Sequence, residues 1–235
     1  MKITRRALLI SGGVLGGGFL LGVAGIGGYV STYDRRAIQQ GALPQGNARL
    51  ITTWLELSPD GKITILSPHT EMGQGAMTGL RQIVLEELDA DPEKTVIEFA
   101  PVEPEFANSD NLAGFVLGDG DDTSWARGFM EKGLGRAAHF AGMQVTGGSS
   151  SIRFTGWKGM RTAAAAAREM LITAAAAKLG VPASELTTAN GQIIHAKSDR
   201  KVGYGELAEA ASKLEVPASP KFKDPSRWKH IGKPA

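Results

Sequence analysis

The amide side chain of Gln74 lies between two glycines in the segment HTEMGQGAMTG, which covers residues 69–79. A primary amide offers two hydrogen-bond donors and an acceptor oxygen without carrying charge. Because Gly73 and Gly75 have no side chains, a large flat ligand could approach the backbone on either side of Gln74. These three residues are therefore candidates for binding a neutral or electron-rich group.

A second glycine-containing turn occurs in the segment TGGSSS, residues 146–151. Thr146, Gly147 and Gly148 precede three hydroxyl side chains, those of Ser149, Ser150 and Ser151. Backbone amides and hydroxyls in such a turn can form a nest for a phosphate or an oxo ligand, and free N–H groups at a helix start favour the same ligands. Both turns could instead be plain helix caps, with Gln74 a solvated turn residue, and spacing alone does not separate the two interpretations.

No catalytic residue can be assigned from spacing. Glu71 and His69 could form a proton-transfer pair, but an ordinary surface pair is the simpler interpretation. The four histidines have no ligand-like spacing, so we expect no metal held by side chains. Without cysteine, this chain can form neither a disulfide nor a thiolate-bound iron–sulfur cluster. The phosphate-loop pattern G-x-x-x-x-G-K-[ST] is also absent.

The elements around the first turn follow from hydrophobic periodicity. Residues 50–68, LITTWLELSPDGKITILSP, alternate like two strands about the turn Ser58–Gly61, where proline presets φ and glycine accepts a positive φ. From Leu80, apolar residues recur at helical spacing to about residues 91–92. The opposite side of this helix carries the acids Glu86, Glu87 and Asp89. The next strand is expected at residues 95–102.

The second half of the chain is predicted to contain two further helices and a hairpin. Residues 103–148 have little periodicity, which is typical of a functional or disordered connection, with one short helix at about 127–140. The Ala-rich run 157–180 predicts a helix closed by Gly180 and packed closely on a sheet. An Asn190-Gly191 hairpin and a helix from about Tyr204 follow. The predicted fold class is α/β (α+β), with mixed sheets and packed helices.

Four regions are expected along the chain. They are a signal or anchor at residues 1–33, a polar linker at 34–49, a globular region at 50–215 and an extended Pro- and Lys-rich tail at 216–235. The apolar run 7–30 would form a helix of roughly 36 Å, enough to cross a bilayer core of about 30 Å.

Two interpretations of the N-terminal segment stay open. The pair Arg5-Arg6 with Leu8 and Leu9 resembles a twin-arginine export signal. Small residues four apart, such as Gly12 and Gly16, would suit a retained membrane helix. Either interpretation predicts a location at the cytoplasmic membrane, on its periplasmic side.

The charge distribution argues against nucleic-acid binding. The net charge is +2, but Lys2, Arg5 and Arg6 precede residue 34 in a stretch without acids, so the rest of the chain has a net charge of −1. Binding to nucleic acid depends on a basic surface that neutralises phosphates. We therefore expect no nucleic-acid partner.

Several segments together resemble one enzyme family. They are PHTEMGQGAMTGLRQIVLEELDAD, TGGSSSIRFTGWKGMRTAAAAAREML, ANGQIIHAKSDRKVGYGELAEAA and KDPSRWKHIGKP. From about residue 50 onward, the chain resembles the N-terminal part of the large molybdopterin-binding (beta) subunit of the isoquinoline 1-oxidoreductase and membrane-bound aldehyde dehydrogenase type. This type belongs to the xanthine dehydrogenase/aldehyde oxidase superfamily.

The resemblance implies a cofactor and roles for both turns. It implies a molybdenum–molybdopterin cofactor, for which a cytosine dinucleotide form is one option. Gln74 matches the family glutamine that hydrogen-bonds an oxo ligand or the pterin, and Gly73 and Gly75 match its flanking glycines. Residues 146–151 match the segment that wraps the cofactor. The implied reaction is oxidation of an aldehyde or N-heterocycle with water as the oxygen source.

The resemblance also implies partners and an incomplete site. A separate 2Fe-2S subunit would accept the electrons, and a cytochrome c subunit is compatible with the family type. The family's general-base glutamate lies far toward the C-terminus of a much longer subunit, and no residue here matches it. We therefore expect the lone chain to be inactive, with the remaining molybdenum domain on another chain if the subunit is split. The alternative is a membrane-tethered, non-catalytic remnant or assembly protein derived from this domain.

Overall fold

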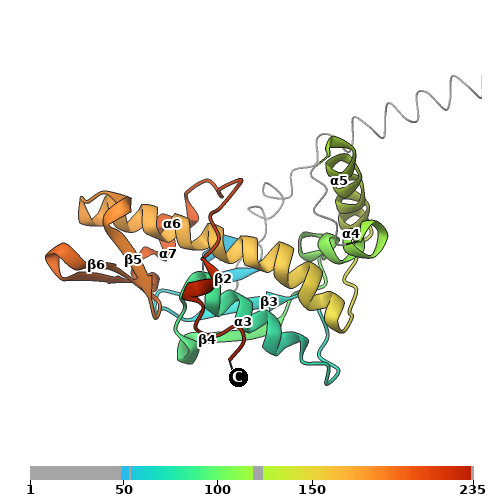
Figure 1. The fold of residues 1–235 in the computed structure, drawn as a ribbon, viewed down its shortest axis with the longest axis horizontal. Coiled ribbons are helices and arrows are strands. Elements are labelled where there is room, and N and C mark those ends of the chain that lie inside the picture. Colours follow the sequence, from blue (N-terminus) through green and yellow to red (C-terminus); the bar gives the residue numbers. More distant parts are fainter. Residues whose placement is uncertain (1–48, 53, 119–123, 234–235) are drawn as a thin grey trace, which may run out of the picture.

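The computed structural model describes residues 49–52, 54–118 and 124–233, and shows helices packed on two small sheets (Figure 1). The expectations for residues 1–33 and for nearly all of the 34–49 linker lie outside this range. Within the described part of the chain, no helix combines the length and apolar character needed to cross a membrane.

The larger sheet has four strands in the order β1-β2-β3-β4, namely Arg49–Thr52, Leu55–Leu57, Ile63–Ser67 and Thr95–Phe99. The β2–β3 pair confirms the predicted hairpin, and its turn is closed by the Gly61 N–H, which donates to the Ser58 carbonyl at 2.9 Å. The segment before this turn was predicted as one strand, but it forms two antiparallel strands, β1 and β2. Gly61 has φ +85°, the left-handed conformation that glycine adopts without cost. β3 and β4 are parallel, with Ile65 opposite Ile97, and the helix α3 (Ala76–Leu88) connects them.

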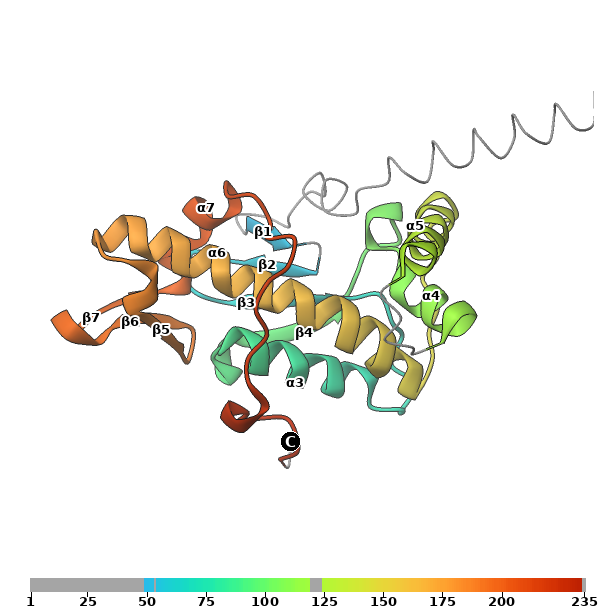
Figure 2. The same ribbon diagram turned by 45° about the horizontal axis from the view of Figure 1, so that its top comes forward.

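The long connection after β4 contains two helices rather than one. The helix α5 (Trp125–Phe140) confirms the predicted short helix, but α4 (Ser109–Leu117) was not predicted. The helix α4 is only nine residues long and includes Asn111 and Gly114, which weaken a helical pattern in the sequence. Figures 1 and 2 show the α4–α5 hairpin at one end of the molecule, with the smaller sheet at the other.

The Ala-rich helix is longer than its sequence pattern indicates. A π-helical segment, Ser151–Met160, runs directly into α6 (Arg161–Leu179), which ends at Gly180 in the left-handed conformation as predicted. Small buried side chains such as Ala164 and Ala175 face the core. They allow the close packing expected of this helix.

The smaller antiparallel sheet follows, in the order β5-β6-β7, with strands Leu186–Ala189, Gln192–His195 and Arg200–Gly203. Asn190 and Gly191 both have positive φ, 46° and 69°, which confirms the hairpin turn. The helix α7 (Tyr204–Ser212) begins at the predicted residue.

The acids of α3 are buried, which the periodicity of the helix does not reveal. Glu86 and Glu87 are 0% and 1% exposed. Residues 221–231, which we call the tail strap, fold back over them, and the Lys223 ammonium group lies 2.8 Å from Glu86 and 2.6 Å from Asp89. Figure 2 shows this red segment crossing α6 toward α3. Periodicity places the acids correctly on one side of the helix, but it cannot show that a distant basic segment covers that side.

Candidate cofactor-binding site

The first predicted turn lies at the carboxyl end of β3. Residues 68–75, which we call the glutamine turn, join β3 to α3. In a sheet with parallel strands, ligands bind preferentially in the crevice outside the carboxyl ends of those strands. The turn begins with a local cap, in which the His69 N–H donates to the Ser67 hydroxyl at 3.1 Å.

Both glycines beside Gln74 have left-handed backbones. Gly73 has φ +85° and Gly75 has φ +75°, so the turn requires glycine for its conformation and not only for clearance. A Cβ atom added to either residue would meet nothing within 4 Å. The turn therefore leaves open space on both sides of Gln74, as the sequence analysis predicts.

The amino end of α3 is already occupied by Glu71. Its carboxylate accepts hydrogen bonds from the backbone N–H groups of Gly73, Gly75 and Met77, at 2.8, 3.1 and 3.0 Å. The Met77 bond is the main cause of a lowered pKa of Glu71. Glu71 forms neither a proton-transfer pair nor an ordinary surface pair with His69, because its carboxylate caps the helix. An incoming anion would have to compete with this carboxylate, so the helix start favours a neutral ligand.

The Gln74 side chain connects the two turns. Its Nε2 atom donates to the Thr70 carbonyl at 2.8 Å and to the Gly147 carbonyl at 3.3 Å. Its Oε1 atom accepts from the Met72 N–H at 2.5 Å. The amide is thus a structural link here rather than a solvated turn residue.

The second turn, residues 146–151, which we call the serine turn, runs into the helix that continues as α6. Ser149 and Ser150 are already helical, so this turn is shorter than its sequence indicates. The hydroxyl of Ser151 is fully buried, whereas Gly148 and Ser149 are exposed. Within the described residues, the hydroxyls of Ser149 and Ser150 make no hydrogen bond, which leaves both available to a ligand.

Close helix packing brings the two turns together. A Cβ atom on Gly79 of α3 would lie 2.6 Å from the Ile152 side chain, and one on Gly156 would lie 2.9 Å from Ile83. A Cβ atom at either position would displace the end of an isoleucine side chain, so the two glycines help α3 and the π-helical segment to lie in direct contact. Their amino ends, which carry the two turns, are consequently neighbours.

Direct hydrogen bonds then join the turns. The Thr70 N–H donates to the Thr146 hydroxyl at 2.9 Å, and the Nδ1 atom of His69 lies 3.1 Å from the Ser151 hydroxyl. His69 is 1% exposed, and its Nε2 atom has no hydrogen-bond partner among the described residues. Burial lowers the pKa of His69 to about 4, and the backbone of Val145 opposes this shift in part. His69 is therefore a neutral, buried group at neutral pH.

Two asparagines that the sequence analysis did not single out hold the serine turn from behind. Asn108 pairs with the backbone of Val145 through bonds of 2.7 and 3.0 Å, and Asn111 donates to the same carbonyl at 3.0 Å. Both side chains are almost completely buried. The only signal in the sequence is their place in a stretch rich in Gly, Asp and Asn, and that composition does not identify single residues.

The two turns together fit a large, flat and largely neutral ligand. They combine open glycine backbone at Gly73, Gly75 and Gly148 with two available hydroxyls, and the one carboxylate within the two turns is that of Glu71. The described residues contain no group of three His, Asp or Glu side chains that could hold a metal ion. The chemistry of the donors thus suits contacts to a cofactor rather than direct ligation of a metal.

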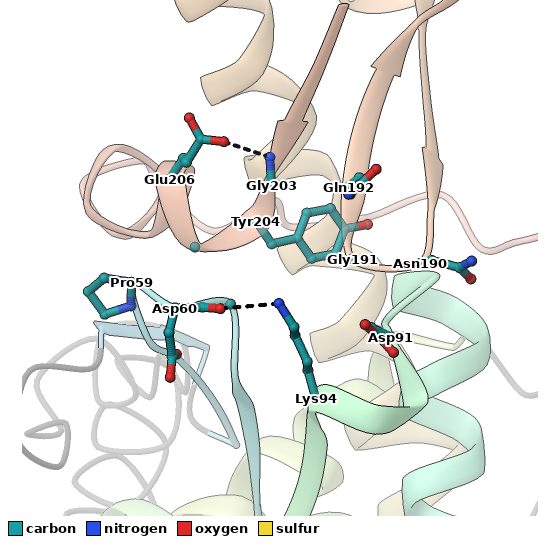
Figure 3. A pocket seen from close by; sticks show the side chains of 12 residues that line it. Pro59, Asp60, Asp91, Lys94, Asn190, Gly191, Gln192, Gly203, Tyr204 and Glu206 are labelled. Atoms are coloured by element: carbon teal, nitrogen blue, oxygen red, sulfur yellow. Dashed lines mark hydrogen bonds between the residues drawn. The ribbon is translucent and has the colours of Figure 1, made fainter.

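The cavity shown in Figure 3 is lined by residues of neither the glutamine turn nor the serine turn, and its volume is about 220 Å³. It lies between the Pro59–Gly61 turn, Lys94 and the amino end of α7. Its charged groups already have partners, because Lys94 donates to the Asp60 carbonyl at 3.5 Å and Glu206 accepts from the Gly203 N–H at 3.1 Å. We assign it no chemical role.

Sequence comparison matches this chain to a molybdopterin cofactor-binding family and to two known proteins. The family model described as a molybdopterin cofactor-binding domain matches residues 15–100, which include the glutamine turn but not the serine turn. The beta subunit of isoquinoline 1-oxidoreductase from Brevundimonas diminuta is 32% identical over 166 residues, which are 71% of this chain and 17% of the relative. The membrane-bound aldehyde dehydrogenase [pyrroloquinoline-quinone] from Gluconacetobacter polyoxogenes is 26% identical over 208 residues, which are 88% of this chain and 21% of the relative.

Among solved structures, quinoline 2-oxidoreductase from Pseudomonas putida 86 aligns with 72% of this chain and 17% of its own length, at 18% identity and a TM-score of 0.42. The matched region spans only about a fifth of the length of the two relatives compared by sequence. On the sequence matches, the chain belongs with the molybdopterin cofactor-binding domains and is homologous to the beta subunit of isoquinoline 1-oxidoreductase and to membrane-bound aldehyde dehydrogenase.

Proposed function

We propose that this chain forms the molybdopterin-binding part of a molybdenum hydroxylase that oxidises an aldehyde or an N-heterocycle. The observation that carries the proposal is the direct pairing of the two turns, through Thr70 with Thr146 and Gln74 with Gly147. Residues 76 positions apart in the sequence thereby form one surface with open glycines and available hydroxyls.

The chain's own residues would bind and orient the cofactor. The bond from Gln74 to Gly147, at 3.3 Å, is the longest that the amide makes, so it is the one most easily exchanged for a bond to the cofactor. Ser149 and Ser150 would add hydroxyl donors, and Gly73, Gly75 and Gly148 would admit the flat ring system. When bound, the cofactor would supply two-electron oxidation of an electron-poor carbon with oxygen from water.

The rest of the proposed enzyme would lie outside this chain. We propose that the electrons pass to a 2Fe-2S subunit, with a cytochrome c subunit as a further acceptor, and that a remaining molybdenum domain supplies the catalytic base. The cytosine dinucleotide form of the cofactor, export by the twin-arginine route and a periplasmic membrane location belong to the same proposal. They rest on the resemblance of the chain and on the sequence of residues 1–33.

Metal and cofactor analysis of the assembled protein tests the proposal. The chain is co-expressed with the iron–sulfur subunit and the remaining molybdenum domain, and the wild type is compared with Gln74→Ala. The matched control is Gln192→Ala, an exposed glutamine far from both turns. We expect molybdenum in the wild type and the control, with turnover or cofactor retention lowered about 10- to 100-fold in Gln74→Ala, as for other residues that orient a metal centre.

Three results would contradict the proposal in different ways. Unchanged turnover in Gln74→Ala with full molybdenum occupancy would remove the role of Gln74. If the assembled protein contained pyrroloquinoline quinone and no molybdenum, its cofactor would be the one that appears in the name of the Gluconacetobacter relative. Absence of both cofactors would favour a non-catalytic remnant or assembly protein.

A further inference from the structure

The contacts between the two turns form a closed ring of hydrogen bonds. His69 Nδ1 lies 3.1 Å from Ser151 Oγ, and that hydroxyl donates to the Gly147 carbonyl at 2.9 Å. The same carbonyl accepts from Gln74 Nε2, which also donates to the carbonyl of Thr70, the neighbour of His69. The ring therefore runs from one turn to the other and back through two separate connections.

The connection through Ser151 is the more strongly built of the two. Its hydroxyl also accepts from the Gly147 N–H at 3.1 Å, so Ser151 contacts both backbone polar groups of that residue. The same hydroxyl lies 3.1 Å from His69 Nδ1, whose role as donor or acceptor depends on the tautomer of His69. His69 and Ser151 are 1% and 0% exposed, so water cannot readily replace either partner.

The connection through Gln74 is the weaker one. Its bond to Gly147 is 3.3 Å long, and Gln74 is only partly buried. If Gln74 turned toward a cofactor, it would give up this bond first. The spacing of the two turns would then depend on His69, Ser151 and the Thr70–Thr146 bond.

We infer that His69 and Ser151 are positioning residues that hold the serine turn at a fixed distance from the glutamine turn while Gln74 exchanges its Gly147 bond for a cofactor contact. This inference rests on the proposed function for the identity of the ligand. The coupling of the two turns exists without the ligand and can be measured without it.

Hydrogen exchange of the cofactor-free full chain, followed by mass spectrometry, tests the coupling. The variants are Ser151→Ala, His69→Leu and His69→Asn, and the last keeps an N–H donor near the position of Nδ1. The control is Tyr204→Phe, which removes another buried hydrogen bond, from the Tyr204 hydroxyl to the Leu88 carbonyl at 2.7 Å. The effect of Tyr204→Phe on thermal stability should be similar to that of His69→Leu, because each of these two changes deletes one buried side-chain hydrogen bond, whereas Ser151→Ala deletes three.

We expect Ser151→Ala and His69→Leu to speed amide exchange at least about fivefold in both turns, since a buried hydrogen bond is worth roughly that factor or more. His69→Asn should restore most of the protection, and Tyr204→Phe should leave both turns unchanged. Faster exchange confined to the mutated turn, or equal loosening by Tyr204→Phe, would overturn the inference. If Ser151→Ala does not fold, the comparison of His69→Leu with His69→Asn decides the matter.

Cofactor retention in the assembled protein supplies the second readout. Molybdenum content should fall in Ser151→Ala and His69→Leu, recover in His69→Asn and stay at the wild-type level in Tyr204→Phe. Equal molybdenum in all variants would reject positioning by His69 and Ser151 while leaving the proposed function intact. A wild-type protein without molybdenum would instead reject the proposed function, and the exchange data would still decide whether the turns are coupled.

Discussion

The carboxylate of Glu71 caps α3, where its Oε2 atom accepts a hydrogen bond from the Met77 N–H at 3.0 Å. With the bond from Gly75, two N–H groups of the helix start are satisfied by this side chain, which also accepts from the N–H of Gly73 in the preceding turn. Glu71→Ala should therefore lower the melting temperature by about 2–4 °C, as expected for loss of a helix cap in a protein of this size. Thermal unfolding followed by circular dichroism measures this, and Glu103→Ala, at a cap position without a side-chain bond, is the control.

The stability that the Glu71 cap contributes should decrease as the solution becomes acidic. Because the folded-state pKa of Glu71 is lowered from 4.5, its contribution to stability is complete above pH 4.5 and is lost as the pH falls through the folded-state value. The difference in melting temperature between wild type and Glu71→Gln should thus be constant near neutral pH and shrink in acid. A difference that grows on acidification would contradict the assignment of Glu71 as an ionised cap.

The two roles of Gly73, backbone conformation and clearance, can be separated by substitution. Its φ of +85° disfavours alanine, whereas asparagine tolerates the left-handed region better. Because a Cβ atom would meet nothing within 4 Å, Gly73→Ala should destabilise the cofactor-free chain only through backbone strain, by about 1 kcal/mol, and Gly73→Asn by less. Urea denaturation measures both. If the space is reserved for a cofactor, Gly73→Asn should nevertheless retain less molybdenum than Gly73→Ala, because its side chain is larger.

Local sequence patterns predicted the elements that carry the site, but not the contacts that join them. The Ser58–Gly61 and Asn190–Gly191 turns, α3 and the Ala-rich helix depend on residues close in sequence, and all four are present. The Thr70–Thr146 bond spans 76 residues and the His69–Ser151 contact 82, so no periodicity could reveal them.

Glu71 and His69 do not form the pair that their spacing suggests. They are two residues apart in the sequence, but Glu71 turns toward the amino end of α3, while His69 is buried against Ser151. Two side chains at this spacing in an irregular turn have no fixed relative direction. Only the packing of α3 on the π-helical segment decides which of them is buried.

Burial of neutral His69 should make folding sensitive to pH between 4 and 6.5. The folded-state pKa of about 4 lies below the ordinary histidine pKa of 6.5, so the unfolded chain binds the extra proton in this range, and stability falls as the pH drops. The contribution of His69 to this loss should be about 3 kcal/mol between pH 6.5 and pH 4. Urea denaturation at several pH values compares the wild type with His69→Asn, which has no titrating group at this position. An unchanged pH dependence in the variant would show that His69 is not buried as a neutral group.

The tail strap should depend on Lys223 more than on any other side chain of that segment. The Lys223 ammonium group is 3% exposed and forms ion pairs with both Glu86 and Asp89. The Glu86 carboxylate also accepts hydrogen bonds from the N–H groups of Lys229 and His230, each at 2.6 Å. Burial alone would raise the pKa of Glu86, but these bonds outweigh it and the pKa is lowered. Lys223→Met should therefore destabilise the protein by about 3–5 kcal/mol, because it leaves buried carboxylates without their cation.

Lys221→Ala is the matched control, since this exposed lysine contributes backbone rather than side-chain bonds to the strap. It should change the free energy of unfolding by less than about 0.5 kcal/mol. Adding Glu86→Gln and Asp89→Asn to Lys223→Met should recover part of the lost stability, because the uncompensated charges are then removed. If Lys223→Met and Lys221→Ala cost the same in urea denaturation, the ion cluster does not hold the strap on α3.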